Sequence, residues 1–563
     1  MDYEKRIWDL ISQMTLEEKI GQLQQCGPSL VGAFDVSFEE LLDMMFDGKI
    51  SQEEFARLME TAEQDYHEED LRAGRIGSYN GIGDAATANR LQKIAVEESR
   101  LGIPLLFGYD VIHGFRTVTP IPLAESCAWE PSLWEETARM AAKEATAAGM
   151  EMDMTSNVYS EELKALIEKE EVSERVLDSA VADVLRIKFE LGLFEHPYQT
   201  DEIREKSAML TAEHRALARK VAVNSIVLLK NEKFDGKNPI LPLKEGTRLG
   251  IVGKLANSRA EMTGAWAIGA EPEACVSMVD ACQNKNISYQ YTETIAQAEQ
   301  LADEIDVFVA AVGESKEQSG EAASRADITL SQEDAELVER LLATGKPVIV
   351  VLFNGRPLAI PQLAEHVPAI LEAWHPGVEA GNAILDILFG KENPSAKLTT
   401  TFPAASGQCP MYYAHFNTGR PGGKSKFTSK YLDAPIKPVF PFGYGLSYTS
   451  FEYQNLNVEW KKNTFYVTVE VCNCGKRDGK EIVQCYIKNP TGSRVRPVRQ
   501  LKGFQKLEIP AGEMRSVSFE IPLDDVGYYD WNMKKVVDFG EYTFYVGGNV
   551  EDTLEKSIDI ARK

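Results

Sequence analysis

Residues 305–353 read IDVFVAAVGESKEQSGEAASRADITLSQEDAELVERLLATGKPVIVVLF and contain a complete strand, loop, helix and strand. Two apolar runs, residues 305–313 and 346–353, have the length and composition of buried strands. The segment SQEDAELVERLLATG between them has helical periodicity and ends in a glycine. Because a helix that joins consecutive strands is typical of parallel pairing, this stretch predicts an α/β fold.

The same alternation extends on both sides of this unit, over residues 209–405. Further strands are expected at SIVLLK, RLGIVG and PAILEAW, with helical stretches between them. We therefore expect an α/β sandwich domain here, in which helices cover a parallel sheet.

Residues 1–197 also mix helices with strand-like runs. The pairs Thr15–Glu18 and Ser132–Glu135 have the spacing of a capping box, which predicts a helix start at each. The apolar run LGIPLLFGYD, Leu101–Asp110, predicts a buried parallel strand whose last residue emerges at the strand's C-terminal end. This region is therefore expected to be a second α/β domain.

Helical periodicity disappears after a connector, residues 406–449, that is rich in Gly, Pro and aromatic residues. The runs TFYVTVEVCN, KEIVQCYIKN, MRSVSFEIPL and GEYTFYVGG then predict short strands separated by turns. Residues 450–563 are therefore expected to form a small β-sandwich.

The chain is acidic, with 86 Asp and Glu against 60 Lys and Arg and a net charge of −26. Nucleic acid and anionic membrane surfaces repel such a chain, so neither is expected as a partner. The N-terminal stretch MDYEKRIWDLISQM lacks the apolar core of a signal peptide, and PVIVVLF is too short to span a bilayer. The eight scattered cysteines predict no disulfide framework, and a cytoplasmic location is expected.

Motifs for metal, nucleotide and Ser–His chemistry are absent from the sequence, which has no HExxH, GxSxG, Walker loop or dinucleotide fingerprint. We expect neither a metal site nor a cofactor. His113 and His375 each follow a predicted strand, where structural hydrogen bonding is expected more than ligation. Two carboxylates stand out: Asp110 at a strand end and Glu321 in a long Gly/Ser-rich loop, although solvation alone is the simpler reading of either.

Several segments, in order along nearly the whole chain, resemble glycoside hydrolase family 3, the three-domain β-glucosidase type. The most specific are the runs that begin at Trp374 and Pro441. The matching segments are MTLEEKIGQL, GIPLLFGYDVIHG, VLRIKFELGLFEHPY, NSIVLLKN, GESKEQSGEAASRADITL, LFNGRPLAI, WHPGVEAGNAILDILFGKENPSAKLTTTFP and PFGYGLSYTSFEY.

The resemblance implies a (β/α)8 barrel, then an α/β sandwich, then a fibronectin-III-like domain. It also implies an exo-acting hydrolase that releases a terminal β-linked sugar with retention, so the expected partner is a small β-glycoside or oligosaccharide. The family's sugar-gripping aspartate corresponds to Asp110, which would hold sugar hydroxyls by charge-assisted hydrogen bonds. Its acid/base glutamate corresponds to Glu321, which would protonate the leaving oxygen and later activate water.

The family's nucleophile, the Asp of an SDW-like motif on a late barrel strand, has no counterpart between Asp110 and the end of the first domain. The only Asp-Trp pair, Asp530–Trp531, lies in the predicted β-sandwich and is interpreted as a turn. A complete barrel needs about 250 residues, and residues 1–197 are too few. The first domain is therefore expected to be a truncated barrel, spliced near residues 149–150, with the nucleophile unknown.

Two carboxylates on the spliced segment EMDMTSNVY, Glu151 and Asp153, are possible stand-ins for the nucleophile. One of the two must face inward because strand side chains alternate, but catalysis requires closely preorganised geometry. Two functions therefore stand: a retaining β-glucosidase-type hydrolase, or a catalytically inactive carbohydrate-binding or structural remnant. The shortened barrel could also pair with a second copy, so a homo-oligomer is left open.

Overall fold

The computed structural model describes residues 3–27, 29–31, 44, 49–50, 63–147, 164–234, 236 and 238–561. Contacts divide the chain into two compact units. Unit 1 consists of Met1–Arg116 and Arg139–Thr211, and unit 2 consists of Thr117–Ala138 and Ala212–Lys563.

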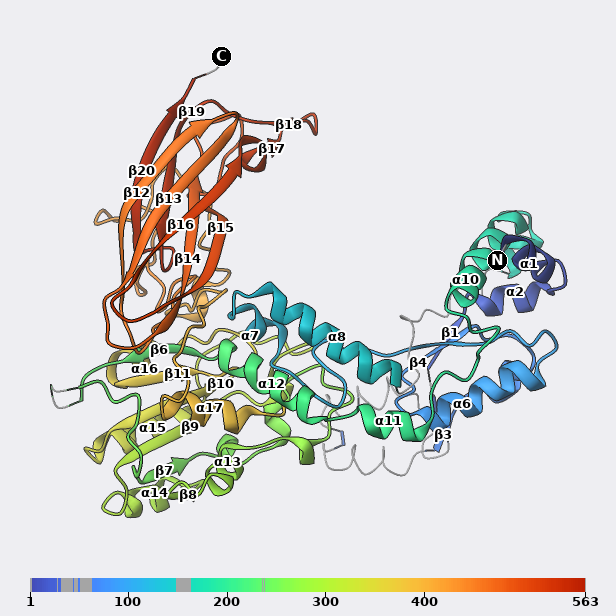
Figure 1. Ribbon diagram of the computed structural model, residues 1–563, viewed down its shortest axis with the longest axis horizontal. Coiled ribbons are helices and arrows are strands. Elements are labelled where there is room, and N and C mark those ends of the chain that lie inside the picture. The colour runs from blue at the N-terminus through green and yellow to red at the C-terminus, as the bar shows by residue number, and fades with distance from the viewer. Residues whose placement is uncertain are drawn as a thin grey trace. The chain divides into compact units, whose positions relative to one another are not determined.

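Unit 1 combines a small parallel sheet with helices (Figure 1, dark blue to green). Its central strand β4 pairs in parallel with β1 on one side and β5 on the other, so the C-terminal ends of all three strands lie at one edge. The elements are α1 (Tyr3–Ile11), α2 (Leu16–Gln22), β1 (Gln25–Cys26), β2 (Ser29–Val31), β3 (Glu63–Asp65), α5 (Glu68–Arg72), β4 (Ser78–Asn80), α6 (Ala85–Lys93), β5 (Leu106–Gly108), α9 (Lys164–Glu168), α10 (Glu174–Glu190) and α11 (Glu202–Ala208).

Helices α1, α2 and α10 share an apolar core in which Ile7, Val181 and Leu185 are completely buried. The predicted capping box starts α2: the Thr15 hydroxyl accepts from the Glu18 amide, and the Glu18 carboxylate accepts from the Thr15 amide. Lys188 on α10 is also fully buried; its ammonium donates to the Gln22 side chain and to the Gly77 carbonyl. These contacts fix α10 against the segments that lead into β1 and β4.

Unit 2 contains a six-stranded sheet in the order β6, β11, β10, β9, β7, β8. All neighbours are parallel except β6, which runs antiparallel to β11. Its elements are α7 (Pro122–Ser126), α12 (Ala212–Ser225), β6 (Val227–Asn231), β7 (Leu249–Val252), α13 (Met278–Asn284), β8 (Tyr289–Thr292), α14 (Ile295–Leu301), β9 (Val307–Gly313), α15 (Gln332–Ala343), β10 (Val348–Phe353), α16 (Pro361–His366), β11 (Ala369–Glu372) and α17 (Ala380–Leu388).

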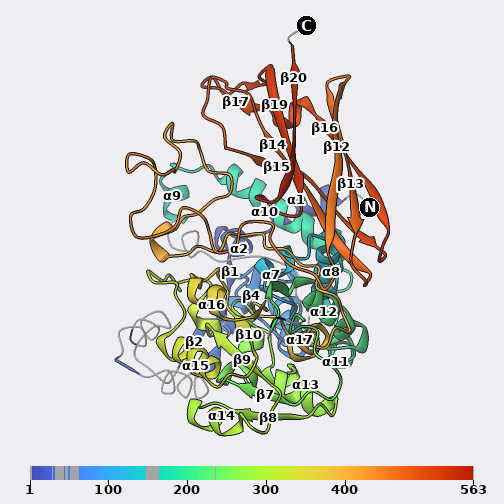
Figure 2. The same cartoon turned by 90° about the vertical axis from the view of Figure 1, so that its left-hand side faces the viewer.

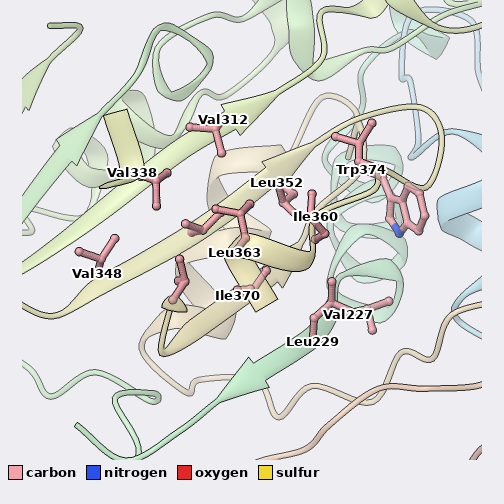
Figure 3. Packing of buried hydrophobic residues seen from close by; sticks show 14 of the residues in the cluster. Val227, Leu229, Val312, Val338, Val348, Leu352, Ile360, Leu363, Ile370 and Trp374 are labelled. Carbon is pink, nitrogen blue, oxygen red and sulfur yellow. The ribbon is translucent and has the colours of Figure 1, made fainter. Parts of the chain in front are cut away.

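The core of this sheet forms because its central strands are apolar on both faces. All six residues of β10 and the first six of β9 are buried, as expected for a parallel sheet covered on both sides. Figure 3 shows Val338 of α15 and Leu363 of α16 packed toward the strand residues Val312 and Leu352. Each completely buried side chain of this size contributes about 2 kcal/mol of hydrophobic stabilisation.

The C-terminal part of unit 2 is a β-sandwich, whose two main sheets lie face to face in Figure 2. One sheet has the order β12, β13, β16 and the other β15, β14, β19, β20. Burial alternates strictly along β13, which directs Phe465, Val467 and Val469 into the core between the sheets. The strands are β12 (Phe451–Lys461), β13 (Thr464–Asn473), β14 (Gly479–Lys488), β15 (Gln500–Ile509), β16 (Met514–Pro522), β17 (Tyr528–Tyr529), β18 (Lys535–Val536), β19 (Gly540–Gly547) and β20 (Thr553–Ile560).

Helix α8 (Pro131–Ala147) begins two residues earlier than the sequence suggested, at Pro131 and not at Leu133. Pro131 is the first helical residue, so Ser132 lies inside the helix and the capping box predicted for Ser132 and Glu135 is wrong. Proline is favoured at this position because its fixed φ suits a helix and its missing N–H would have no helical partner. The predicted splice near residues 149–150 lies outside the described residues.

Residues 117–138 fall within the numbers of the predicted first domain but pack in unit 2. Ile121, Ala124 and Cys127 belong to the core of the six-stranded sheet, and the indole N–H of Trp129 donates to the Lys397 carbonyl at 2.9 Å. The boundaries predicted at 197, 405 and 449 stay predictions. No helix within the described ranges is both long and apolar enough to cross a membrane.

Candidate active site

The two carboxylates singled out by the sequence lie in different units. Asp110 is in unit 1, two residues after β5, and Glu321 is in unit 2, in the loop between β9 and α15. Both follow a strand of a parallel sheet at its C-terminal end, which is where parallel α/β proteins place their ligand sites.

Asp110 is half-buried at the C-terminal edge of the β1–β4–β5 sheet. Gly108 lies opposite Asn80 in the parallel register, and its carbonyl accepts from the Gly81 amide at 3.0 Å. The neighbouring Tyr109 ring packs edge-on against Phe115, with 5.3 Å between ring centroids, and burial raises the pKa of its hydroxyl. Asp110 thus follows a rigidly packed residue and remains partly accessible to a ligand.

Glu321 is exposed on a tight backbone bend. Both of its neighbours have positive φ, +103° at Gly320 and +55° at Ala322. A β-carbon at Gly320 would lie 2.7 Å from that of Ala265, so glycine is required there both for its conformation and for space. The backbone is therefore constrained on both sides of Glu321, whose side chain is exposed.

An aromatic side chain lies beside this bend. Trp266 is 40% exposed, and its ring atoms come within 3.5 Å of the position that a β-carbon on Gly320 would take. A partly exposed indole next to a carboxylate offers an apolar face and a polar group together, as ligand sites commonly do.

The start of the Glu321 loop is fixed by a contact with the short helical turn Ala260–Met262. The Lys316 amide donates to the Glu261 carboxylate, and the Nδ1 atom of His375 lies 2.8 Å from the Glu261 carbonyl oxygen. Burial raises the pKa of Glu261. His375 is completely buried and makes this contact inside the fold.

The ends of β9, β10 and β11 bring three buried polar side chains together under the loop: Glu314, Asn354 and Glu372. The Glu372 carboxylate accepts from the Trp374 amide at 2.9 Å and from the Asn354 side chain at 3.3 Å. Complete burial raises the pKa of Glu372 well above its usual range, and the nearby Glu314 adds to the effect. Glu372 therefore favours its protonated form.

The other carboxylates considered in the sequence analysis do not contribute to this site in the part of the chain that the structure describes. Glu151 and Asp153 lie outside the described residues. Asp530 does form the predicted turn, in the β17–β18 hairpin, where its carboxylate accepts from the amides of Asn532 and Lys534. In the part of the chain that the structure describes, no three His, Cys, Asp or Glu side chains are grouped closely enough to hold a metal ion.

Three family models match the chain in the order of its elements. The glycosyl hydrolase family 3 N-terminal domain matches residues 15–158, the family 3 C-terminal domain residues 226–448, and a fibronectin type III-like domain residues 481–550. The chain belongs to glycoside hydrolase family 3. The resemblance inferred from the motifs is confirmed, as is an α/β architecture followed by a fibronectin-III-like sandwich.

Relatives and solved structures of the family agree with this assignment. A periplasmic β-glucosidase of Salmonella typhimurium is 38% identical over 457 residues, which cover 73% of this chain and 59% of the relative. A β-xylosidase of Formosa agariphila is 34% identical over 448 residues, covering 74% and 60%. The chain thus spans about three fifths of the length of these relatives. A mutant β-glucosidase from Listeria innocua in complex with laminaribiose is 27% identical with a TM-score of 0.86, and the match covers 99% of each chain.

Sequence reasoning missed three polar residues of unit 2 that lie at or just after the ends of strands β9, β10 and β11. Glu314 directly follows β9, Arg356 follows β10 by three residues, and Glu372 is the last residue of β11. Each stands at the C-terminal end of a predicted parallel strand, and this shared position was the signal that could have identified them. Trp266 comes 14 residues after the end of β7, too far from the strand for its position to mark it.

Proposed function

We propose that this chain is a glycoside hydrolase of the β-glucosidase type, acting on terminal nonreducing β-linked sugars of small glycosides or oligosaccharides. Glu321 is the acid/base and Asp110 grips the terminal sugar. The observation that carries the proposal is the exposed Glu321 on its constrained bend, held at the end of the sheet in the domain that matches the family model.

In a retaining mechanism, the leaving oxygen takes a proton from Glu321 as the glycosidic bond breaks. The same residue then removes a proton from the water that releases the sugar. Asp110 can accept hydrogen bonds from sugar hydroxyls, and such charge-assisted bonds fix orientation as well as add affinity. The Trp266 indole offers an apolar face for the group on the other side of the scissile bond.

The covalent step needs a second carboxylate roughly 5–5.5 Å from the acid/base. The sequence offers no SDW-like motif between Asp110 and Pro197, so no residue is assigned as the nucleophile. This absence favours a second candidate function, a carbohydrate-binding protein without turnover, built from a truncated barrel.

Hydrolysis of aryl β-glucosides and β-xylosides by the full chain separates the two candidates. Under the first, Glu321→Ala lowers kcat/KM by on the order of 10²–10⁴-fold for substrates with poor leaving groups. Glu317→Ala, which removes an exposed carboxylate from the same loop, is the matched control and leaves the rate unchanged. Loss of activity in both variants alike would reject the role given to Glu321.

Labelling with a 2-fluoro glycoside tests the missing step directly. A glycosyl ester trapped on a side chain and located by mass spectrometry identifies the nucleophile and excludes the second candidate. Under the second candidate no ester forms and no turnover occurs, but calorimetry detects glucose binding that Asp110→Ala abolishes. Asp183→Asn, an exposed carboxylate of α10, is the control for unit 1. A chain that neither turns over nor binds sugar would reject both functions.

The cytoplasmic location and the homo-oligomer stay predictions. Sedimentation of the purified chain over a range of concentrations would decide the oligomeric state.

A further inference from the structure

The buried carboxylate of Glu314 lies at the base of the loop that carries Glu321. Its side chain is 2% exposed and receives two guanidinium groups from different segments. Arg325 approaches through Nη1, 2.6 Å from Oε1, and Arg356 through Nε, 3.2 Å from Oε2. Arg325 belongs to the same loop, four residues after Glu321, whereas Arg356 follows strand β10.

Arg356 also holds the backbone on both sides of Glu321. Its Nη2 atom donates to the carbonyl of Gln318, three residues before Glu321, and to the carbonyl of Ala323, two residues after it, the latter at 2.8 Å. One guanidinium thus joins the buried carboxylate to both arms of the bend. A guanidinium suits this task because its donors project in a rigid planar fork.

The fit between β10 and the loop leaves little room for another arrangement. Gly355 stands next to Arg356, and a β-carbon there would lie 1.9 Å from the Ser319 hydroxyl oxygen. Ser319 itself is buried. The end of β10 and the arm of the loop that precedes Glu321 are therefore in direct contact.

We infer that Glu314 is a positioning residue for the acid/base: through Arg356 and Arg325 it sets the conformation of the bend that presents Glu321. The catalytic part of this inference rests on the proposed function of Glu321. A carboxylate that fixes two guanidinium groups holds them more firmly than a neutral amide can, because its hydrogen bonds are charge-assisted.

A second buried carboxylate of unit 2 provides a matched control. Asp386 on α17 is 4% exposed and is paired with three cations, Arg219 of α12, Lys285 at the end of α13 and Lys391 just after α17. Its partners hold helices, and none of them belongs to the Glu321 loop. Asp386→Asn therefore removes an equivalent buried charge without touching the bend.

Hydrogen exchange of the purified full chain tests the structural half of the inference. In Glu314→Gln we expect amides of residues 315–325 to lose at least tenfold in protection, while α15 stays protected. Asp386→Asn should leave residues 315–325 within about twofold of the wild type. Unchanged protection in Glu314→Gln, or equal loss in both variants, would overturn the inference. Because Glu314→Gln could fail to fold, Arg356→Lys is the second variant; it keeps the charge but loses the fork and should loosen the same segment.

Kinetics test the catalytic half. Displacing a proton donor by about 1 Å lowers the rate on the order of 10²-fold. This loss occurs only for substrates whose leaving group must be protonated as it departs. In Glu314→Gln we expect kcat/KM to fall by about that factor for an alkyl β-glucoside and by less than threefold for a dinitrophenyl β-glucoside. Glu314→Asp should recover part of the loss, and Asp386→Asn should affect both substrates equally. An equal fall for both substrates in Glu314→Gln would assign Glu314 a purely structural role.

The hydrogen-exchange and kinetic experiments test the inference and the proposed function separately. If the wild-type chain shows no turnover, the proposed hydrolase function fails. Hydrogen exchange still decides whether Glu314 positions the bend.

Discussion

Replacing Lys188 by methionine should change how the stability of unit 1 depends on pH. The ammonium is completely buried and contacts only neutral oxygens, those of Gln22 and Gly77, at 2.7 and 2.8 Å. No ion pair to it occurs among the residues that the structure describes. Burial without a counter-charge lowers the pKa of Lys188 from 10.5 to about 7, because removing a charge from water is costly.

The direction in which stability changes with pH follows from the number of protons that the folded and unfolded states bind. Between pH 7 and 10.5 the unfolded chain binds a proton at this lysine and the folded chain does not, so stability rises with pH over this window. Below pH 7 both states are protonated and the dependence vanishes. At one pKa unit per 1.36 kcal/mol, the full shift corresponds to about 5 kcal/mol, of which about 2 kcal/mol falls between pH 7 and 9.

Lys188→Met keeps most of the packing and removes the titration. We expect the wild type to gain about 2 kcal/mol relative to the variant between pH 7 and 9. For a unit of this size that is about 4–8 °C in the melting transition. Scanning calorimetry of both proteins at pH 7, 8 and 9 measures the difference, and Lys169→Met, an exposed lysine of unit 1, is the control. A constant difference between wild type and Lys188→Met across this range would refute the reasoning.

Two further predictions concern unit 2. Burial raises the pKa of Glu125 to about 7, so the folded state binds the extra proton between about pH 4.5 and 7, and stability should fall across this range. Glu125→Gln should flatten that decline in thermal unfolding curves, and an unchanged slope would contradict the assignment. Gly355→Ala places a methyl group 1.9 Å from the Ser319 hydroxyl and should cost about 1–3 kcal/mol through overpacking. Urea unfolding measures this cost, and a loss below about 0.5 kcal/mol would show that the contact relaxes.

The sequence predicted strands best where burial alternates or is continuous. TFYVTVEVCN is β13 from first residue to last. Apolar and polar residues alternate along it, as expected for a strand with one face in the core of a sandwich. The run SIVLLK covers all of β6 except its last residue, Asn231. An apolar run carries no information about strand direction, however, and β6 is antiparallel to its neighbour. Strand β8 was not expected because its polar residues, Tyr289–Thr292, pair only at the edge of the sheet.

Residues of the candidate site were predictable from the sequence only where they lie in a recognisable motif. Asp110 and Glu321 come from recognisable segments. The ion pair between Glu314 and Arg356 joins residues 42 positions apart in the chain, and no local pattern links them before the strands are assembled. The same is true of Trp266, which comes close to the Glu321 bend only through the packing of Gly320.

The supports of Glu321 described above, Glu314, Arg325, Arg356 and Ser319, all come from one compact unit. The proposed proton donor therefore keeps these supports when sequence outside unit 2 changes. A deletion or exchange within unit 1 would therefore leave the residues that support Glu321 in place. A graft of unit 2 onto another protein has to carry residues 117–138 as well as residues 212–563, because both segments form this unit.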